Sequence, residues 1–206
     1  PVDPNSTNPY QLTEADRTVI GNTTPKFSGG FGLNATYKGF DMSMFFNFMY
    51  DFDVLNANKI MLTTWADNKE NNFLMDIASD KRWRNFDDMG NEIRYSPEVL
   101  AEFNKNATMW NPTSIGRPIC MSYAVEDGSF LRLNSATLGY TLPSVWTKKV
   151  GLSKVRFYVS GNNLFTLTGY SGYDPEVNIA TGLTPNIDYN RYPRSRTYTF
   201  GAQLTF

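Results

Sequence analysis

The chain contains 206 residues with a formal net charge of −1, no histidine and a single cysteine, Cys120. The balanced charge, without a basic stripe, argues against a nucleic-acid partner, and the missing histidine removes the commonest general base and metal ligand. The mean hydropathy is −0.41, and no run of about 18 apolar residues offers a spanning helix. A transmembrane strand, however, needs only about ten residues of alternating character.

Residues 27–37 and 39–50 each carry an apolar side chain at almost every second position, the period of a strand. Lys38–Gly39 between them fits a two-residue hairpin turn, because glycine readily adopts the positive φ that such a turn needs. The apolar positions are Phe27, Phe31, Leu33, Ala35, Tyr37, Phe40, Met42, Met44, Phe46, Phe48 and Tyr50.

Three more strands are predicted at residues 128–142, 154–166 and 196–206. In the first of these the apolar positions change phase between Leu133 and Ala136, which indicates either a β-bulge or a strand end that rises above a membrane. An apolar face needs a second protein layer in water, whereas in an outer-membrane barrel it meets lipid. The side chains expected on the outward, lipid-facing side include Phe27, Phe31, Met42, Phe46, Phe157, Val159, Phe200 and Leu204.

The connections between these strands alternate between short and long. Lys38–Gly39 and residues 143–153 are short, with one helical turn expected at 144–149, whereas residues 51–127 and 169–194 span 77 and 26 residues. Transmembrane barrels have short periplasmic turns and longer extracellular loops, so the pattern predicts two extracellular loops and a periplasmic carboxy terminus. Loops of this length are usually functional.

Five strands cannot close, since a small filled barrel takes about eight, and open sheet edges are not tolerated in lipid. The sequence therefore predicts an all-β fold class: an antiparallel transmembrane β-barrel segment whose outer edges pair with strands outside residues 1–206.

Several blocks of the sequence resemble the carboxy-terminal end of SusC/RagA-type TonB-dependent transporters. The blocks are DGSFLRLN at 127–134, TLGYTLP at 137–143, VSGNNLF at 159–165, GYSGYDPE at 169–176 and YPRSRTYTFG at 192–201. TVIGNTTPKF at 18–27 and YKGFD at 37–41 are similar to the preceding hairpin of the same family. The resemblance implies a plugged barrel of about 22 strands, with the plug and TonB box before residue 1. It also implies a SusD-like surface lipoprotein as lid and import of oligosaccharides or oligopeptides powered through TonB.

Asp3, Asn5 and residues 12–17 resemble a family loop with EF-hand-like spacing of oxygen ligands. A calcium loop needs ligands at alternate positions, a glycine turn and a final carboxylate. Pro4 and Pro9 interrupt this spacing and no glycine precedes Gly21, so a solvated loop is favoured over a metal site. No metal or other cofactor is expected.

Aromatic side chains in the two long loops are candidates for contact with a glycan or peptide ligand or with the lid, because flat rings beside amides and carboxylates suit such recognition. For each ring taken singly, loop packing is the favoured interpretation. The candidates are Trp65, Trp83, Trp110, Tyr170 and Tyr173.

Polar residues on the inner face of the strands are expected to face the lumen or the plug, since buried polar groups need hydrogen-bond partners. These residues are Asp41, Asn47, Arg156, Asn162 and Gln203. Arg132 and Arg156 are predicted to pair with plug carboxylates.

Two other functions remain open on the residues alone: an outer-membrane enzyme, or a structural or adhesin barrel without TonB coupling. An enzyme needs a nucleophile and a base within reach of each other, and no motif with that geometry occurs. Paired acids such as Asp87 and Asp88 could serve glycoside hydrolysis on residue type alone, but adjacent acids in a polar loop are ordinarily solvated. The sequence therefore favours a transporter segment over an enzyme.

Overall fold

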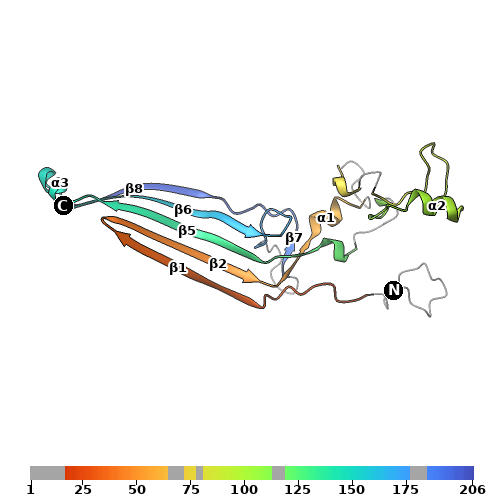
Figure 1. Ribbon diagram of the computed structural model, residues 1–206, viewed down its shortest axis with the longest axis horizontal. Helices are drawn as coiled ribbons and strands as arrows, with labels where there is room; N and C mark the ends of the chain where they lie inside the picture. The colour runs from red at the N-terminus through yellow and green to blue at the C-terminus, as the bar shows by residue number, and fades with distance from the viewer. Residues whose placement is uncertain (1–16, 65–71, 78–80, 113–118, 177–184) are drawn as a thin grey trace.

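The computed structural model describes residues 17–64, 72–77, 81–112, 119–176 and 185–206. Its main feature is a five-stranded antiparallel sheet with strand order β1-β2-β5-β6-β8 (Figure 1). The strands are β1 Phe27–Tyr37, β2 Phe40–Tyr50, β5 Phe130–Thr141, β6 Lys154–Thr168 and β8 Thr197–Thr205. All five predicted strands are present, and their ends lie within two residues of the predicted ones.

The short connections lie together at one end of this sheet, beside the carboxy terminus (Figure 1). Lys38 and Gly39 both have positive φ, 46° and 90°, as the hairpin turn requires. The connection after β5 forms the expected helical turn, as α3 Ser144–Thr147 and the 3-10 helix η5 Lys148–Val150, and it ends at Gly151 with a φ of 74°. The long connections all begin and end at the opposite end of the sheet.

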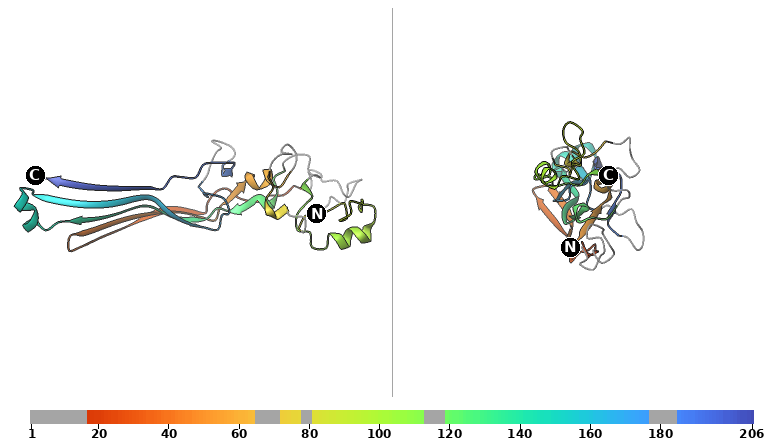
Figure 2. Two further views of the ribbon diagram at one scale, coloured as in Figure 1. Left: turned by 90° about the horizontal axis from the view of Figure 1, so that it is seen from above. Right: turned by 90° about the vertical axis from the view of Figure 1, so that its right-hand side faces the viewer.

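The strand register places the apolar side chains on one face. Phe31 lies opposite Phe46, with ring centroids 4.9 Å apart, and another row on the same face runs from Met42 through Leu138 to Val159 and Phe200. This face stays open to its surroundings on this chain, where Phe200 is 80% exposed. Seen from above in Figure 2, the strands form one thin layer that extends away from the loop structures.

The change of phase in the third predicted strand is a β-bulge. The register between β2 and β5 shifts at Phe45/Phe46, where Ser135 and Leu133 are the successive partners, so Asn134 is the extra residue. The register between β5 and β6 shifts at the same place, next to Asn163, whose φ is 53°. The bulge keeps Leu133 on the apolar face and turns Arg132 to the polar face, opposite Asn47.

The long loop 51–127 contains secondary structure that the sequence did not predict. Strands β3 and β4 continue the β2–β5 hairpin, and β7 from the second loop adds to β3 in parallel, so a small sheet has the order β4-β3-β7. No helix in the described ranges is long and apolar enough to cross a membrane. The elements are β3 Asp53–Asn56, α1 Ala57–Met61, η2 Met75–Ile77, α2 Pro97–Phe103, η4 Ser122–Ala124, β4 Val125–Asp127 and β7 Ile187–Asp188.

The buried core sits where the five-stranded sheet meets these loops. Phe52, Val54, Phe130 and Tyr170 pack together. Gly128 crosses this cluster so closely that a Cβ there would lie 2.6 Å from Phe52 and Val54 side-chain carbons. Only glycine therefore fits at this position, and the core fixes the loop base to the top of the sheet.

Candidate functional site at the loop end of the sheet

An ion pair crosses the polar face of the sheet near its turn end. Arg156 on β6 donates from Nε to Asp41 Oδ1 on β2 at 2.8 Å, so its side chain passes over the strand between them, β5. Gly139 lies beneath the pair, and a Cβ there would lie 2.6 Å from both Asp41 Oδ1 and Arg156 Nε. The missing side chain at residue 139 makes room for the pair.

The other predicted lumen residues share this polar face. Asn47 lies opposite Arg132, Asn162 opposite Ser135, and Gln203 opposite Arg156. Asn47 Oδ1 is buried and has no hydrogen-bond partner among the described residues. Whether these side chains contact a plug stays a prediction.

Arg132 is the most deeply buried charged side chain described, 1% exposed. Its guanidinium group makes a two-pronged contact with Asp174, donates from Nη1 to Asn163 Oδ1 at 2.9 Å, and lies over the Phe130 ring. Burial raises the pKa of Asp174, but the hydrogen bonds from Arg132 and from the Glu176 N–H outweigh it, so this pKa lies below its usual value. Asp174 is therefore held ionised against Arg132.

Arg132 and Arg156 were predicted to pair with plug carboxylates, and their contact with a plug stays a prediction. Both guanidinium groups meet carboxylates of this same chain, Asp174 and Asp41. The sequence could not reveal these pairs, because their members lie 42 and 115 residues apart and meet only through the strand order.

We call residues 169–176 the tethered segment, because four contacts hold it to the five-stranded sheet, to the small sheet and to the residues before β8. The Tyr170 hydroxyl donates to Asp188 Oδ2 at 2.7 Å, and Ser171 donates from N and Oγ to Glu126, both at 2.9 Å. Asp174 binds Arg132, as described, and Glu176 Oε1 binds Arg194 Nη2 at 2.9 Å. No local pattern in the sequence indicates these contacts.

Tyr173 stands between two of these anchors and is 86% exposed. Its neighbour Gly172 crosses the Tyr170 ring, where a Cβ would lie 2.6 Å from Cζ. The backbone on both sides of Tyr173 is therefore held, while its ring is free to meet a ligand or another protein.

Glu126 on β4 joins the two long loops. It binds Lys59 Nζ at 3.0 Å, Asn56 Nδ2 at 3.1 Å and Ser171. Burial raises its pKa, but the hydrogen bonds from the Ser171 N–H, Lys59, the Ser171 hydroxyl and Asn56 together lower it below the usual value. A charged Glu126 thus ties helix α1 to the tethered segment.

The aromatic candidates separate into packed and exposed rings. Trp110 donates from Nε1 to the Thr63 carbonyl at 3.0 Å and packs edge-on against Tyr123, and Tyr170 is 6% exposed. Trp83 is 41% exposed and Tyr173 more so. Trp65 lies outside the described residues, as do residues 3–16, the segment for which a solvated loop is favoured over a calcium site. In the described ranges no three acidic or cysteine side chains gather as metal ligands.

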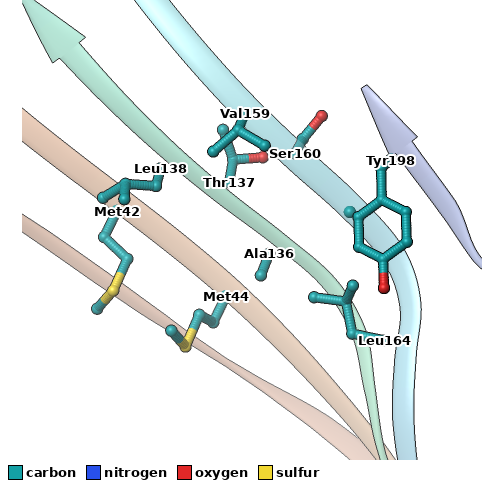
Figure 3. Close-up of a pocket in the computed structure, with 10 residues that line it drawn as sticks. Met42, Met44, Ala136, Thr137, Leu138, Val159, Ser160, Leu164 and Tyr198 are labelled. Carbon is teal, nitrogen blue, oxygen red and sulfur yellow. The ribbon is translucent and has the colours of Figure 1, made fainter. Parts of the chain in front are cut away.

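The opposite, apolar face carries a shallow groove of about 250 Å³ (Figure 3). It arises because Ala136 and Gly161, which lie opposite each other on β5 and β6, are small. Met44 and Tyr198 flank them in the same row. The lining is almost wholly carbon, which suits a lipid-facing surface.

Comparison with known proteins relates this chain to TonB-dependent receptors. No protein-family model matches the chain. The chain is 35% identical over 202 residues to the TonB-dependent receptor P3 of Formosa agariphila, covering 95% of this chain and 18% of that receptor. It is 38% identical over 88 residues to the TonB-dependent receptor SusC of Bacteroides thetaiotaomicron, covering 41% of this chain and 8% of SusC.

Solved structures of a peptide importer also match this chain. The RagAB peptide importer in its closed-closed state matches with a TM-score of 0.70 and 25% identity, and in its open-open state with 0.69 and 26%. Each match covers 95% of this chain and 19% of the other, so the chain spans about a fifth of the length of these relatives. The relatives are receptors and importers, which supports the prediction that the chain is not an enzyme. The chain belongs to the SusC/RagA-type family of TonB-dependent outer-membrane receptors and forms part of a β-barrel wall with its loops.

Proposed function

We propose that the chain supplies wall and extracellular loops to an outer-membrane importer of oligosaccharides or oligopeptides, which works with a SusD-like surface lipoprotein and is energised through TonB. The family relationship supports nutrient import. The single observation that carries a role in ligand or lid contact is the tethered segment, which holds the exposed Tyr173 at the loop end of the wall.

The lengths of the connections support an orientation of the barrel segment in the membrane. The end with the long loops faces the outside, and the end with the short turns and the carboxy terminus faces the periplasm, as in other transmembrane barrels. In this chain β1 and β8 each pair with one neighbour among the described strands. Their free edges pair with other strands of the barrel, because lipid leaves no unpaired backbone groups.

Residues 81–109 form a sub-loop whose two ends are hydrogen-bonded to each other, and this allows a sharp test. Trp83 N donates to the Met109 carbonyl at 2.8 Å, and Met109 N donates to the Lys81 carbonyl at 2.9 Å, so residues 84–107 can be replaced by a short Gly-Ser linker without moving its base. The full transporter carrying this excision should insert normally, yet lose most uptake of labelled oligosaccharide or oligopeptide and most of its lid protein.

Tyr173→Ala tests the exposed ring, with Tyr192→Ala as the matched control because Tyr192 is 88% exposed. Uptake should fall with Tyr173→Ala, remain with the control, and vanish in cells without TonB. Uptake that does not depend on TonB would refute the proposed function. Unchanged uptake and lid association after the excision would refute a transport role for the 84–107 sub-loop.

A further inference from the structure

The sub-loop contains a short hairpin at residues 85–93, which we call the Asp87 hairpin. Ile93 N donates to the Asn85 carbonyl at 2.9 Å and Asp87 N to the Asn91 carbonyl at 3.0 Å. The turn closes through Gly90, whose φ is 85°. Positive φ is easy only for glycine at such a site, so the sequence encodes this turn.

Asp87 organises the turn from within. Its Oδ1 accepts hydrogen bonds from the backbone N–H groups of Met89, at 2.9 Å, and Asn91, at 2.8 Å, and its Oδ2 accepts from Asn91 Nδ2 at 2.9 Å. These bonds, above all the one from the Asn91 side chain, hold the pKa of Asp87 below its usual value. The tip is thus ordered before any partner arrives, which reduces the entropy lost on binding.

The base of the hairpin is fixed as well. Ile93 is buried, 5% exposed. Asn104, next to the end of α2, accepts from Arg84 N at 2.6 Å and donates to the carbonyls of Arg84 and Leu100, both at 2.9 Å. The hairpin is therefore attached to α2, which lies at the end of the molecule opposite the carboxy terminus (Figure 1).

Large apolar side chains are exposed on this hairpin beside charged side chains that form ion pairs. Arg84 binds Asp88 at 2.6 Å and Arg94 binds Glu92 at 2.5 Å, so these charges cancel in pairs. The large side chains left exposed on the hairpin and just beyond it are Phe86 at 49%, Met89 at 84% and Tyr95 at 79%. Exposed apolar side chains on a rigid support suit an apolar recess on a protein.

We propose that the Asp87 hairpin, through Met89, Phe86 and Tyr95, docks into an apolar recess of the lid lipoprotein. This inference rests on the proposed function, because it assumes that the transporter has such a lid. The position of the hairpin favours the lid over lipid, since α2 lies beyond the loop end of the sheet and away from its apolar band (Figure 1). Methionine at the tip suits such a contact, because its flexible side chain adapts to irregular apolar surfaces.

The test uses the full transporter co-expressed with its lid lipoprotein. A photo-crosslinking amino acid at residue 89 should link to the lid, and the double variant Met89→Asp, Tyr95→Asp should lower the lid recovered with the transporter by about tenfold or more, as expected when charges enter an apolar contact. Met75→Asp is the matched control, because Met75 lies in the same long loop and is 81% exposed. Asp87→Ala, which removes the internal acceptors of the turn, should weaken the lid complex to a smaller extent.

The outcomes separate the two proposals. A crosslink from residue 89 to another loop of the same transporter, or to a second copy of it, would overturn the docking inference. So would unchanged lid recovery with the double variant. If uptake still depends on TonB in either case, the proposed function stands without the hairpin contact. A parent transporter that neither holds a lid nor imports would instead refute the proposed function itself.

Discussion

Replacing Asp174 with asparagine should release the tethered segment from the wall. The side chains of Arg132 and Asp174 are 1% and 7% exposed, so solvent does little to screen the charge left on Arg132. Breaking a buried ion pair by removing one partner costs about 3–5 kcal/mol. Glu176 Oε2 lies 3.7 Å from Arg132 Nε and can take over part of the charge, so the lower figure, about 3 kcal/mol, is expected.

Hydrogen–deuterium exchange of the purified full transporter measures this change. The N–H of Glu176 is bound to Asp174 Oδ1 and the N–H of Ser171 to Glu126 Oε2. Asparagine keeps an oxygen for Glu176, so faster exchange of that amide reports opening of the segment rather than loss of its acceptor. A cost of about 3 kcal/mol corresponds to exchange roughly 150-fold faster, since 1.4 kcal/mol is tenfold.

The Ser171 amide and a surface variant serve as controls. If the segment opens as one unit, Ser171 should exchange faster together with Glu176. Asp88→Asn removes an exposed pair with Arg84, whose carboxylate side is 78% exposed, and should cost less than about 1 kcal/mol. An increase below about threefold at Glu176 in Asp174→Asn, against the expected 150-fold, would show that the buried pair does not hold the segment.

Three further predictions concern acid, the cross-sheet pair and the lipid face. The pKa of Asp174 lies below its ordinary value of 3.8, so its contribution to the stability of the tethered segment is complete at higher pH and is lost as the pH falls through the lowered pKa. Protection of the Glu176 amide from exchange, corrected for the intrinsic exchange rate, should therefore hold at pH 5 and fail only below pH 3.8. Gly139→Ala should break the Asp41–Arg156 pair and lower the temperature at which the folded barrel band disappears in electrophoresis. Gly32→Ala is the control and should not lower this temperature, because a Cβ there meets nothing nearer than 3.5 Å. Equal effects of the two variants would contradict the role assigned to Gly139. Phe46→Arg should cost about 2–4 kcal/mol in urea unfolding within lipid vesicles, and an equal loss from Ser43→Arg would refute the assigned facing.

Local alternation was enough to predict the five strands, their faces and the grouping of long loops at one end. A strand turns successive side chains to opposite sides, so which positions share a face depends only on spacing within each segment. Lys38–Gly39 was equally readable, because the backbone conformation of a two-residue hairpin turn selects glycine locally. The phase change before Ala136 was visible too, but only pairing with β2 and β6 showed that Asn134 bulges.

The contacts of the candidate site needed the tertiary structure. Arg132 had to meet Asp174, and Arg156 had to meet Asp41, across 42 and 115 residues. Such pairs depend on the order of the strands in the sheet and on the position at which a loop returns to it. A local sequence pattern predicts neither of these. Trp110 and Tyr170 were indistinguishable from Tyr173 as aromatic loop residues, yet Trp110 packs half-buried against Tyr123, Tyr170 is buried with a hydrogen bond to Asp188, and Tyr173 is exposed. Alternation is set by the geometry of one strand, whereas burial and ion pairing are set by which distant segments the register brings together.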